Sequence, residues 1–258
     1  MIHLGATPGA PRAREGCDAV IRRAEEEARL LSEAGVDAIV LENMHDCPYL
    51  NRDVGPEVVA VMTAALDAVR DAAGGEYDLG VQILAGANRE ALAAAQAVGA
   101  SFVRAEGFVF AHVADEGIMP DADAGRLLRY RREIGAENVR IFADIKKKHS
   151  AHAITADVGL AASARAAEFF GADGLIVTGD ETGQPVILDH LREVRKATRL
   201  PVIVGSGVTP DSIPDLSPHA DGFIVGSYFK RDGVWHNPPD PMRLRDLVDA
   251  VRASRRDS

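Results

Sequence analysis

Short apolar runs rich in β-branched residues alternate along this chain with longer segments in which apolar residues recur at helical spacing. The short runs predict eight β-strands, at residues 2–6, 37–43, 79–84, 101–106, 139–145, 174–179, 201–207 and 222–228. The longer segments predict eight helices, at residues 15–34, 56–73, 89–98, 121–134, 157–170, 188–198, 210–216 and 240–255. Glycine follows several helix ends, as in EAGVDAIV and FFGADGLIV, where a left-handed C-cap reverses the chain toward the next strand.

The repetition of strand and helix predicts a closed parallel barrel. No linker, low-complexity tract or change of composition divides the 258 residues. We therefore predict an α/β protein with a single (β/α)8 TIM-barrel domain over residues 1–258. An open α/β sheet with the same rhythm is the alternative. In a barrel the functional groups gather at the carboxyl ends of the strands, so polar residues at those ends are the candidates for a site.

The fifth predicted strand indicates which side chains face the barrel interior. In the stretch IFADIKKKHSAHAITADV, Ile141 and Ile145 share one parity and fit the face that the helices cover. Asp144 and Lys146 share the other parity with Phe142. We expect both charged side chains to point into the mouth of the barrel.

Other strands deliver polar side chains to the same edge: His3, Glu42, Asn43, Gln82, Arg104, Glu106 and Thr178. A buried charge without a partner costs several kcal/mol, so these groups must pair with one another, with a metal or with a ligand. One interpretation is a structural layer of ion pairs, for example Arg104 with Glu106 or Asp144. A purely structural interior would instead be filled by Val, Ile and Leu, which favours a site.

Charge and composition restrict the partners. The formal net charge of −10 at pH 7 disfavours a nucleic-acid partner. Cys17 and Cys47 fit no CxxC, zinc or disulfide pattern, which is typical of a reducing compartment. No apolar run of about 20 residues predicts a transmembrane segment, and the start has no signal-peptide pattern. We expect a cytoplasmic protein; a homo-oligomer is common for this architecture.

Two glycine-serine turns carry the most specific signal. Gly205, Ser206 and Gly207 follow the seventh strand directly, and Gly226 and Ser227 follow the eighth. TIM barrels often bind phosphate with the loops after these strands. Glycine lets several backbone N–H groups converge on one anion, so local dipoles can hold phosphate in an acidic protein. The alternative is that the glycines only make tight turns.

Four stretches together resemble the BtpA/SgcQ family. They are LENMHDCPY with VGPEVVAVMT, DIKKKHSAHAITADV, DGLIVTGDETGQP, and VIVGSGVTPDSI with ADGFIVGSYFKRDG. The resemblance covers nearly the whole chain and implies a TIM barrel of the ribulose-phosphate-binding type. The family is named for a member involved in photosystem I biogenesis and includes sugar-operon products. By position, the resemblance implies functional motifs at Glu42, Asn43, 144–152, 179–183 and the two turns.

These observations predict an enzyme that acts on a small phosphorylated, sugar-like metabolite, with isomerase-, epimerase- or lyase-type chemistry. The candidate catalytic residues are Asp144, Lys146, Glu42, His149, Arg104 and Glu106. Asp144 or Glu42 would act as base, Lys146 would stabilise an enolate or form a Schiff base, and His149 or His152 would move protons. The candidate substrate- and phosphate-binding residues are Gly205, Ser206, Gly207, Gly226, Ser227, Thr178, Gly179 and Asn43.

Two other hypotheses remain open. A divalent metal held by Glu42, Asp144 and His149 could polarise a carbonyl group, although the spacing of these residues fits no strict metal motif. No other cofactor is predicted. The rival from another class is a non-catalytic assembly or biogenesis factor whose pocket binds a regulatory phosphometabolite or nothing.

Overall fold

All the strands and helices expected from the hydrophobic pattern are present in the expected order. The structure, a computed structural model, describes residues 1–74, 77–179 and 183–256. The chain divides into two compact units. The first unit comprises Met1–Ala105 and Arg126–Ile141, and the second comprises Glu106–Gly125 and Phe142–Ser258.

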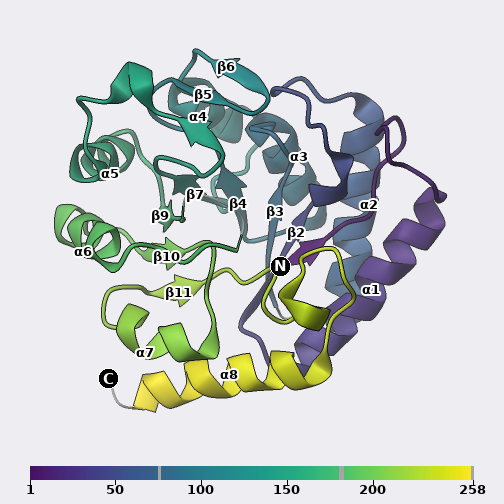
Figure 1. Ribbon diagram of the computed structural model, residues 1–258. Helices are drawn as coiled ribbons and strands as arrows, with labels where there is room; N and C mark the ends of the chain where they lie inside the picture. Colours follow the sequence, from purple (N-terminus) through teal and green to yellow (C-terminus); the bar gives the residue numbers. More distant parts are fainter. Residues whose placement is uncertain (75–76, 180–182, 257–258) are drawn as a thin grey trace. The chain divides into compact units, whose positions relative to one another are not determined.

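The first unit carries four parallel strands in the order β1-β2-β3-β4. They are β1 (Ile2–His3), β2 (Ala38–Glu42), β3 (Asp78–Gln82) and β4 (Phe102–Ala105). The helices that follow the first three strands are α1 (Cys17–Ala34), α2 (Pro56–Ala73) and α3 (Asn88–Val98). Helix α2 packs between α1 and α3, and α3 packs against β3 and β4 (Figure 1). Fully buried aliphatic side chains such as Leu41, Leu66 and Val81 form the core between these layers.

The second unit repeats this arrangement. Its parallel strands are β7 (Arg140–Asp144), whose first two residues belong to the first unit, β9 (Gly174–Val177), β10 (Val202–Val204) and β11 (Gly222–Phe223). They pair in the order β7-β9-β10-β11. The helices of this unit are α5 (Leu160–Phe169), α6 (Leu188–Ala197), α7 (Ile213–Leu216) and α8 (Pro241–Arg256). Helix α4 (Ala124–Glu133), which precedes β7 in the sequence, belongs to the first unit from Arg126 onward. Neighbouring helices pack side by side from α5 to α8 (Figure 1).

Helix ends follow the glycine signals in the sequence. Gly35 and Gly99 cap α1 and α3 in the left-handed conformation, with φ of 77° and 71°. Both donate their N–H groups to carbonyl groups of the last helical turn, which would otherwise lack partners. These caps reverse the chain within a few residues, so β2 and β4 begin directly after the turns.

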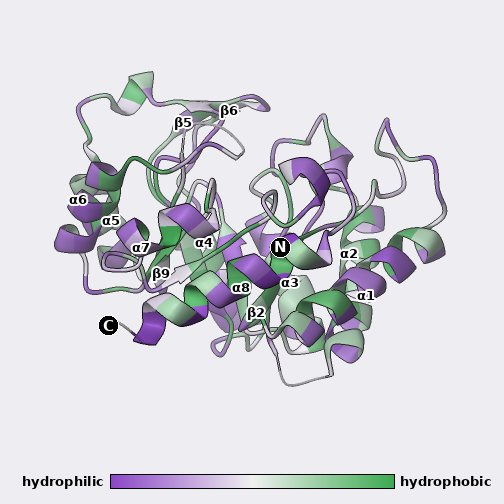
Figure 2. Cartoon of the chain, turned by 60° about the horizontal axis from the view of Figure 1, so that its bottom comes forward, coloured by the Kyte–Doolittle hydropathy of each residue, from purple (hydrophilic) through white to green (hydrophobic). Residues whose placement is uncertain are grey.

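The helices are amphipathic, as the hydrophobic pattern predicts. Helix α8 buries Leu244, Leu247 and Val248, which recur at helical spacing, while Arg245, Arg252, Arg255 and Arg256 are exposed. Figure 2 shows green and purple positions alternating along this helix. The strands are shorter than the apolar runs: β1 and β11 have only two residues each. The remaining residues of these runs form the loops that carry the candidate site.

Candidate functional site

The loops after β4 and β7 form a small antiparallel sheet in the second unit. β5 (His112–Ala114) and β6 (Gly117–Met119) make a hairpin, and β5 also pairs with β8 (Ser150–Ala151). Because this pairing ties two loops together, residues distant in the sequence meet beside the carboxyl end of β7.

A buried lysine lies under this hairpin. The Nζ atom of Lys147 lies 3.3 Å from Oε1 of Glu106 and 3.7 Å from Oε2 of Glu116, which is in the hairpin turn. Burial alone would lower the pKa of Lys147, but the carboxylates of Glu106, Glu116 and Asp144 outweigh it, and the pKa lies above its ordinary value. Lys147 therefore stays protonated at neutral pH and links the hairpin to the end of β7.

The backbone at Lys146 explains why Lys147 is the buried residue. β7 ends at Asp144, and Lys146 has a positive φ of 45°, so the alternation of the strand stops there. Lys147 is 7% exposed, whereas Lys146 is half-buried and its Nζ donates to the carbonyl group of Thr155 at 3.4 Å. The sequence pattern missed Lys147 because it assumed that strand parity continued.

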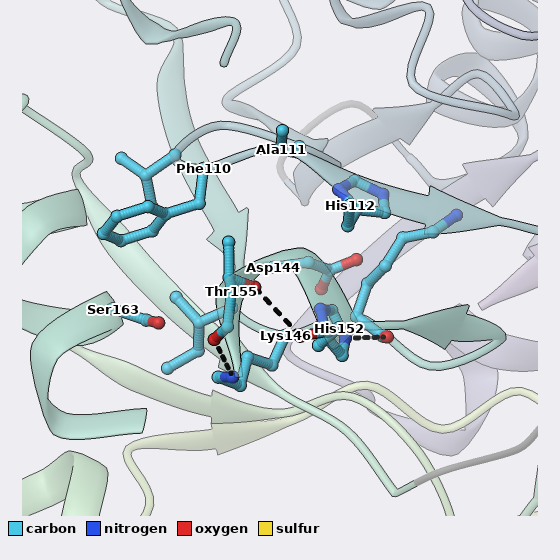
Figure 3. A pocket seen from close by; sticks show the side chains of 12 residues that line it. Phe110, Ala111, His112, Asp144, Lys146, His152, Thr155 and Ser163 are labelled. Atoms are coloured by element: carbon cyan, nitrogen blue, oxygen red, sulfur yellow. Dashed lines mark hydrogen bonds between the residues drawn. The ribbon is translucent and has the colours of Figure 1, made fainter. Parts of the chain in front are cut away.

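A pocket lies beside this turn, within the second unit. It is open to solvent and includes Asp144, Lys146, His112 and His152 in its lining. Figure 3 shows the carboxylate of Asp144 between the rings of His112 and His152, whose centroids are 6.0 Å apart. Asp144 itself is 5% exposed. The pocket thus combines an acid, an amine and two imidazoles.

His152 is held neutral in this pocket. Its Nε2 atom lies 3.2 Å from the carbonyl oxygen of Lys147. Burial lowers the pKa of His152, and the charges of Lys146 and Lys147 lower it further, which outweighs the hydrogen bonds that would raise it. A neutral imidazole at pH 7 can accept a proton, which is the requirement for a general base.

His149, the histidine in the predicted catalytic set, is not among the residues that line the pocket. Its backbone has a φ of 56°, and its Nδ1 lies 3.8 Å from Oδ2 of Asp115, a residue with an exposed side chain. His112 and His152 line the pocket instead. His112 is in the long connection after β4, where no strand pattern could have predicted its direction.

The two glycine-serine turns follow the neighbouring strands β10 and β11 of the second unit. Gly207 has a φ of 65°, and a Cβ atom there would collide with the carbonyl oxygen of Gln184, so only glycine fits. Gly226 and Ser227 lie beyond β11, where the Ser227 carbonyl accepts the N–H of Lys230. Lys230 is 2% exposed, so it is a buried residue.

The predicted binding residues Thr178, Gly179 and Ser206 connect the loops after β7, β9 and β10. The Ser206 hydroxyl accepts the N–H of Gly179 at 2.8 Å and donates to the carbonyl group of Gln184 at 3.3 Å. The Thr178 hydroxyl accepts the N–H of Lys148 at 3.2 Å. These two hydroxyl groups therefore link the loops that follow β7, β9 and β10 to one another. The family-like motif at 179–183 extends over residues 180–182, which are outside the described residues.

In the first unit, Asn43 and Asp46 bind three loops together. Asp46 accepts the N–H and hydroxyl of Thr7, at 2.7 and 2.8 Å, and the Nδ2 group of Asn43 at 2.8 Å. Asn43 in turn accepts the N–H of Leu84 at 2.7 Å. The loops after β1, β2 and β3 are thus fixed by buried hydrogen bonds. A direct contact of Asn43 with substrate stays a prediction.

Glu42 and Arg104 are buried at strand ends of the first unit, at 6% and 3% exposure. Oε2 of Glu42 lies 3.7 Å from Nε2 of His3. The other two metal candidates, Asp144 and His149, belong to the second unit. Among the residues that the structure describes, no three His, Cys, Asp or Glu side chains are grouped so as to hold a metal ion.

Comparison with known proteins identifies the family. Residues 1–253 match the BtpA family. This chain belongs to the BtpA family. It is 45% identical to the "Uncharacterized protein F13E9.13, mitochondrial" of Caenorhabditis elegans, over 99% of this chain and 93% of that protein. It is 35% identical to the "Photosystem I biogenesis protein BtpA" of a Synechocystis strain, over 97% of this chain and 86% of that protein.

Solved structures show the fold of this BtpA-family protein. Thiamine phosphate pyrophosphorylase from Pyrococcus furiosus aligns with a TM-score of 0.56 at 17% identity, covering 89% of this chain and 90% of that one. 3-Hexulose-6-phosphate synthase aligns with 0.55 at 18%, covering 91% and 94%. N-(5'-phosphoribosyl)anthranilate isomerase from Pyrococcus furiosus aligns with 0.53 at 13%, covering 88% and 94%. The predicted α/β TIM-barrel fold is confirmed; its extent as one domain over residues 1–258 stays a prediction.

None of the helices in the described ranges is long and apolar enough to cross a membrane. The compartment, the oligomeric state and the absence of a nucleic-acid partner stay predictions.

Proposed function

We propose that this BtpA-family protein is an enzyme that acts on a small phosphorylated, sugar-like metabolite by isomerase-, epimerase- or lyase-type chemistry. The observation that carries the proposal is the pocket at the end of β7, which combines Asp144, Lys146 and His152. Perturbed titratable groups that converge on one pocket are typical of an active site. The TIM barrel adds support, since its functional groups gather at this end of the strands.

The pocket has the groups that proton transfer beside a carbonyl requires. His152 is neutral at pH 7 because burial and the two neighbouring lysines lower its pKa, so it can remove a proton from carbon. The amine of Lys146 is positioned on the same pocket and can stabilise the negative charge of an enolate. The imidazolium of His152 can then return this proton to the neighbouring carbon, and the carboxylate of Asp144, which Figure 3 shows beside the ring, stabilises the positive charge in between. Lys147 is excluded as a Schiff-base nucleophile at neutral pH, because its raised pKa keeps it charged.

The phosphate group would be held by the turns at Gly205–Gly207 and Gly226–Ser227. These turns leave the neighbouring strands β10 and β11, so both reach the same edge of the second unit. The names of the structural neighbours support a phosphorylated substrate, since a thiamine phosphate pyrophosphorylase, a hexulose-phosphate synthase and a phosphoribosylanthranilate isomerase are among them. An anchored phosphate would hold the reacting carbons in place for catalysis.

The proposal is tested first by measuring the binding of sugar phosphates and then by measuring their turnover. Thermal melts with D-ribose 5-phosphate, D-ribulose 5-phosphate and D-fructose 6-phosphate should find a ligand that, at 100 times its Kd, stabilises by about 2.7 kcal/mol. For a chain of this size that raises Tm by roughly 5–10 °C. Product analysis with the bound sugar phosphate then identifies the reaction.

Asp144→Asn should lower turnover by about 100-fold or more, because it removes the carboxylate that stabilises protonated His152. Asp189→Asn, at an exposed position of α6, is the matched control and should retain full turnover. If no sugar phosphate shifts Tm, or if the two variants turn over equally, the proposal fails.

A non-catalytic biogenesis factor is the second candidate, favoured by the name of the 35% identical Synechocystis relative. Such a factor would bind its partner through an exposed surface. Phe169 and Phe170 at the end of α5 are 86% and 51% exposed and provide a test. If the biogenesis role is right, Phe169→Ser with Phe170→Ser abolishes cellular function and Asp144→Asn does not. The enzyme proposal predicts the reverse.

A further inference from the structure

The pocket at the end of β7 has an aromatic side chain in its lining that the proposed chemistry does not use. Phe110 lines the pocket and is 37% exposed, whereas Phe108, two residues earlier, is fully buried. The backbone of Phe110 has a φ of 61°, in the left-handed region that bulky residues rarely adopt. Gly107 has the same φ, but glycine adopts it without a steric clash. An exposed aromatic ring on a strained backbone, beside a pocket, indicates a functional role.

The two sides of this pocket differ in polarity. Figure 3 shows Phe110 and Ser163 on the opposite side of the pocket from His112 and His152. Ile145 also lines the pocket, and its side chain has no hydrogen-bonding group. A hydroxylated carbon chain placed against Phe110 and Ile145 would leave buried hydroxyl groups unpaired, which weakens binding. A ligand that fills the whole pocket therefore needs an apolar or flat part in addition to its reacting carbons.

Two hydroxyl groups in the lining offer a ligand lone pairs instead of hydrogens. The Ser163 hydroxyl donates to the carbonyl group of Gly159 at 3.1 Å, and the Thr155 hydroxyl donates to the carbonyl group of His152 at 3.4 Å. A hydroxyl group has one hydrogen and two lone pairs, so both can still accept a hydrogen bond. Figure 3 shows the hydroxyl group of Ser163 directed into the pocket. A flat ring with an N–H donor at its edge matches this side of the pocket, whereas a carboxylate would be repelled by the lone pairs.

We propose that Phe110 and Ser163 form a subsite for an aromatic ring, which stacks on Phe110 and donates an N–H hydrogen bond to the Ser163 hydroxyl. Stacking on an aromatic face accepts many kinds of flat ring, and the hydroxyl selects those with a donor at the edge. This inference rests on the proposed function and adds the substrate class to it: a sugar phosphate that is joined to a nitrogen-containing aromatic ring. All the residues of the subsite belong to the second unit. They determine specificity, and the reaction takes place on the side of His152.

The experiment measures the Kd of the full chain for D-ribose 5-phosphate and for the 5′-monophosphates of adenosine, guanosine and cytidine by titration calorimetry. All four probes contain ribose and phosphate, and the three nucleotides add a ring with an amino group. At least one nucleotide should bind the wild type about tenfold more tightly than ribose 5-phosphate, since stacking of a base on an aromatic side chain contributes about this factor. Phe110→Ala should remove the preference and leave the Kd for ribose 5-phosphate unchanged. Ile118→Ala is the matched control, because Ile118 is exposed on the same hairpin but is not among the residues that line the pocket.

The hydrogen bond to Ser163 is tested with a ring that lacks the amino group. Purine riboside 5′-monophosphate is adenosine 5′-monophosphate without this group, and the wild type should bind it several-fold more weakly than the adenosine nucleotide. In Ser163→Ala the two nucleotides should bind equally. If the difference between them is the same in Ser163→Ala as in the wild type, Ser163 does not accept the hydrogen bond.

Other outcomes separate the failure of the subsite from the failure of the proposed function. If ribose 5-phosphate binds the wild type as tightly as all three nucleotides, the ring subsite is refuted and the proposed function is intact. An equal loss of affinity for ribose 5-phosphate and the nucleotides in Phe110→Ala indicates a distorted pocket. Phe110→Leu, which keeps an apolar side chain but no aromatic face, then decides: a retained preference for the nucleotide refutes stacking. If neither the sugar phosphates nor the nucleotides bind the wild type, the proposed function itself fails.

Discussion

The two units build the carboxyl ends of their strands in different ways. In the first unit, buried hydrogen bonds of Asn43 and Asp46 fix the loops, and the polar side chains sit on the strands themselves. In the second unit, Asp144 ends β7, but the other polar groups of the pocket come from loops: His112 from the hairpin and Lys146, Lys147 and His152 from the connection after β7. The first arrangement is suited to hold a fixed row of groups, and the second to surround a pocket.

The two units also differ in the groups that surround a buried charged side chain. Asp46 receives three hydrogen bonds from neutral donors, so its environment is satisfied without any other charge. Lys147 instead balances the carboxylates of Glu106 and Glu116, and removing the lysine would leave two buried negative charges close together. The second unit is therefore the more sensitive of the two to a single change of charge.

The largest effect is expected at Lys147. Lys147→Met retains the apolar stem but leaves the carboxylates of Glu106 and Glu116 without their cation, and should lower the free energy of unfolding by about 3–5 kcal/mol. Lys196→Met, at an exposed position of α6, should change it by less than about 0.5 kcal/mol. Urea denaturation of both variants measures the difference. Similar values for the two would show that the Lys147 ion pairs do not stabilise the second unit.

Measuring the free energy of unfolding at alkaline pH tests the same ion pairs of Lys147. Because the folded pKa of Lys147 lies above its ordinary value, the stabilisation is fully present below about pH 10.5 and is lost as the pH rises through the folded pKa. The difference in stability between the wild type and Lys147→Met should therefore shrink above that pH.

A smaller effect is expected at Asp46. Asp46→Ala leaves the donors of Thr7 and Asn43 buried without an acceptor, and should cost about 2–3 kcal/mol of unfolding free energy. Asp189→Ala, whose side chain is 85% exposed, is the control and should be nearly neutral. A loss below about 1 kcal/mol for Asp46→Ala would mean that solvent replaces the missing carboxylate, and that the loops of the first unit are not fixed by this network.

The smallest effect is the pH dependence that His152 contributes. Its folded pKa lies below the unfolded value of about 6.5, so the unfolded state binds a proton that the folded state does not. Stability should therefore fall as the pH drops below about 6.5, toward the folded pKa. His152→Gln should weaken this dependence, as measured by Tm between pH 5 and 8. An unchanged pH dependence in the variant would contradict a neutral, buried His152.

The alternation of side chains along a strand could be applied to the strands of the first unit. The same rule failed in the loops of the second unit, where the backbone is not extended. Period-two patterns single out Glu42, Gln82 and Arg104 as polar residues within strands, and the structure buries all three. The pattern could not show that a positive φ at Lys146 would bury Lys147 in its place. Nor could it show that β5 pairs with β8 and brings His112 to the end of β7, because that contact joins loops distant in the chain. The glycine caps, by contrast, are local signals, and Gly35 and Gly99 behave as predicted.

In the proposed function, the carboxyl ends of the strands of the second unit hold a phosphorylated sugar, with its phosphate on the glycine-serine turns. A crystal structure with the bound sugar phosphate tests it most directly. We expect density for the phosphate at Gly205–Gly207 and Gly226–Ser227, with the sugar carbons beside Asp144 and Lys146. Phosphate density at any other place, or sugar carbons that touch neither Asp144 nor Lys146, would contradict it.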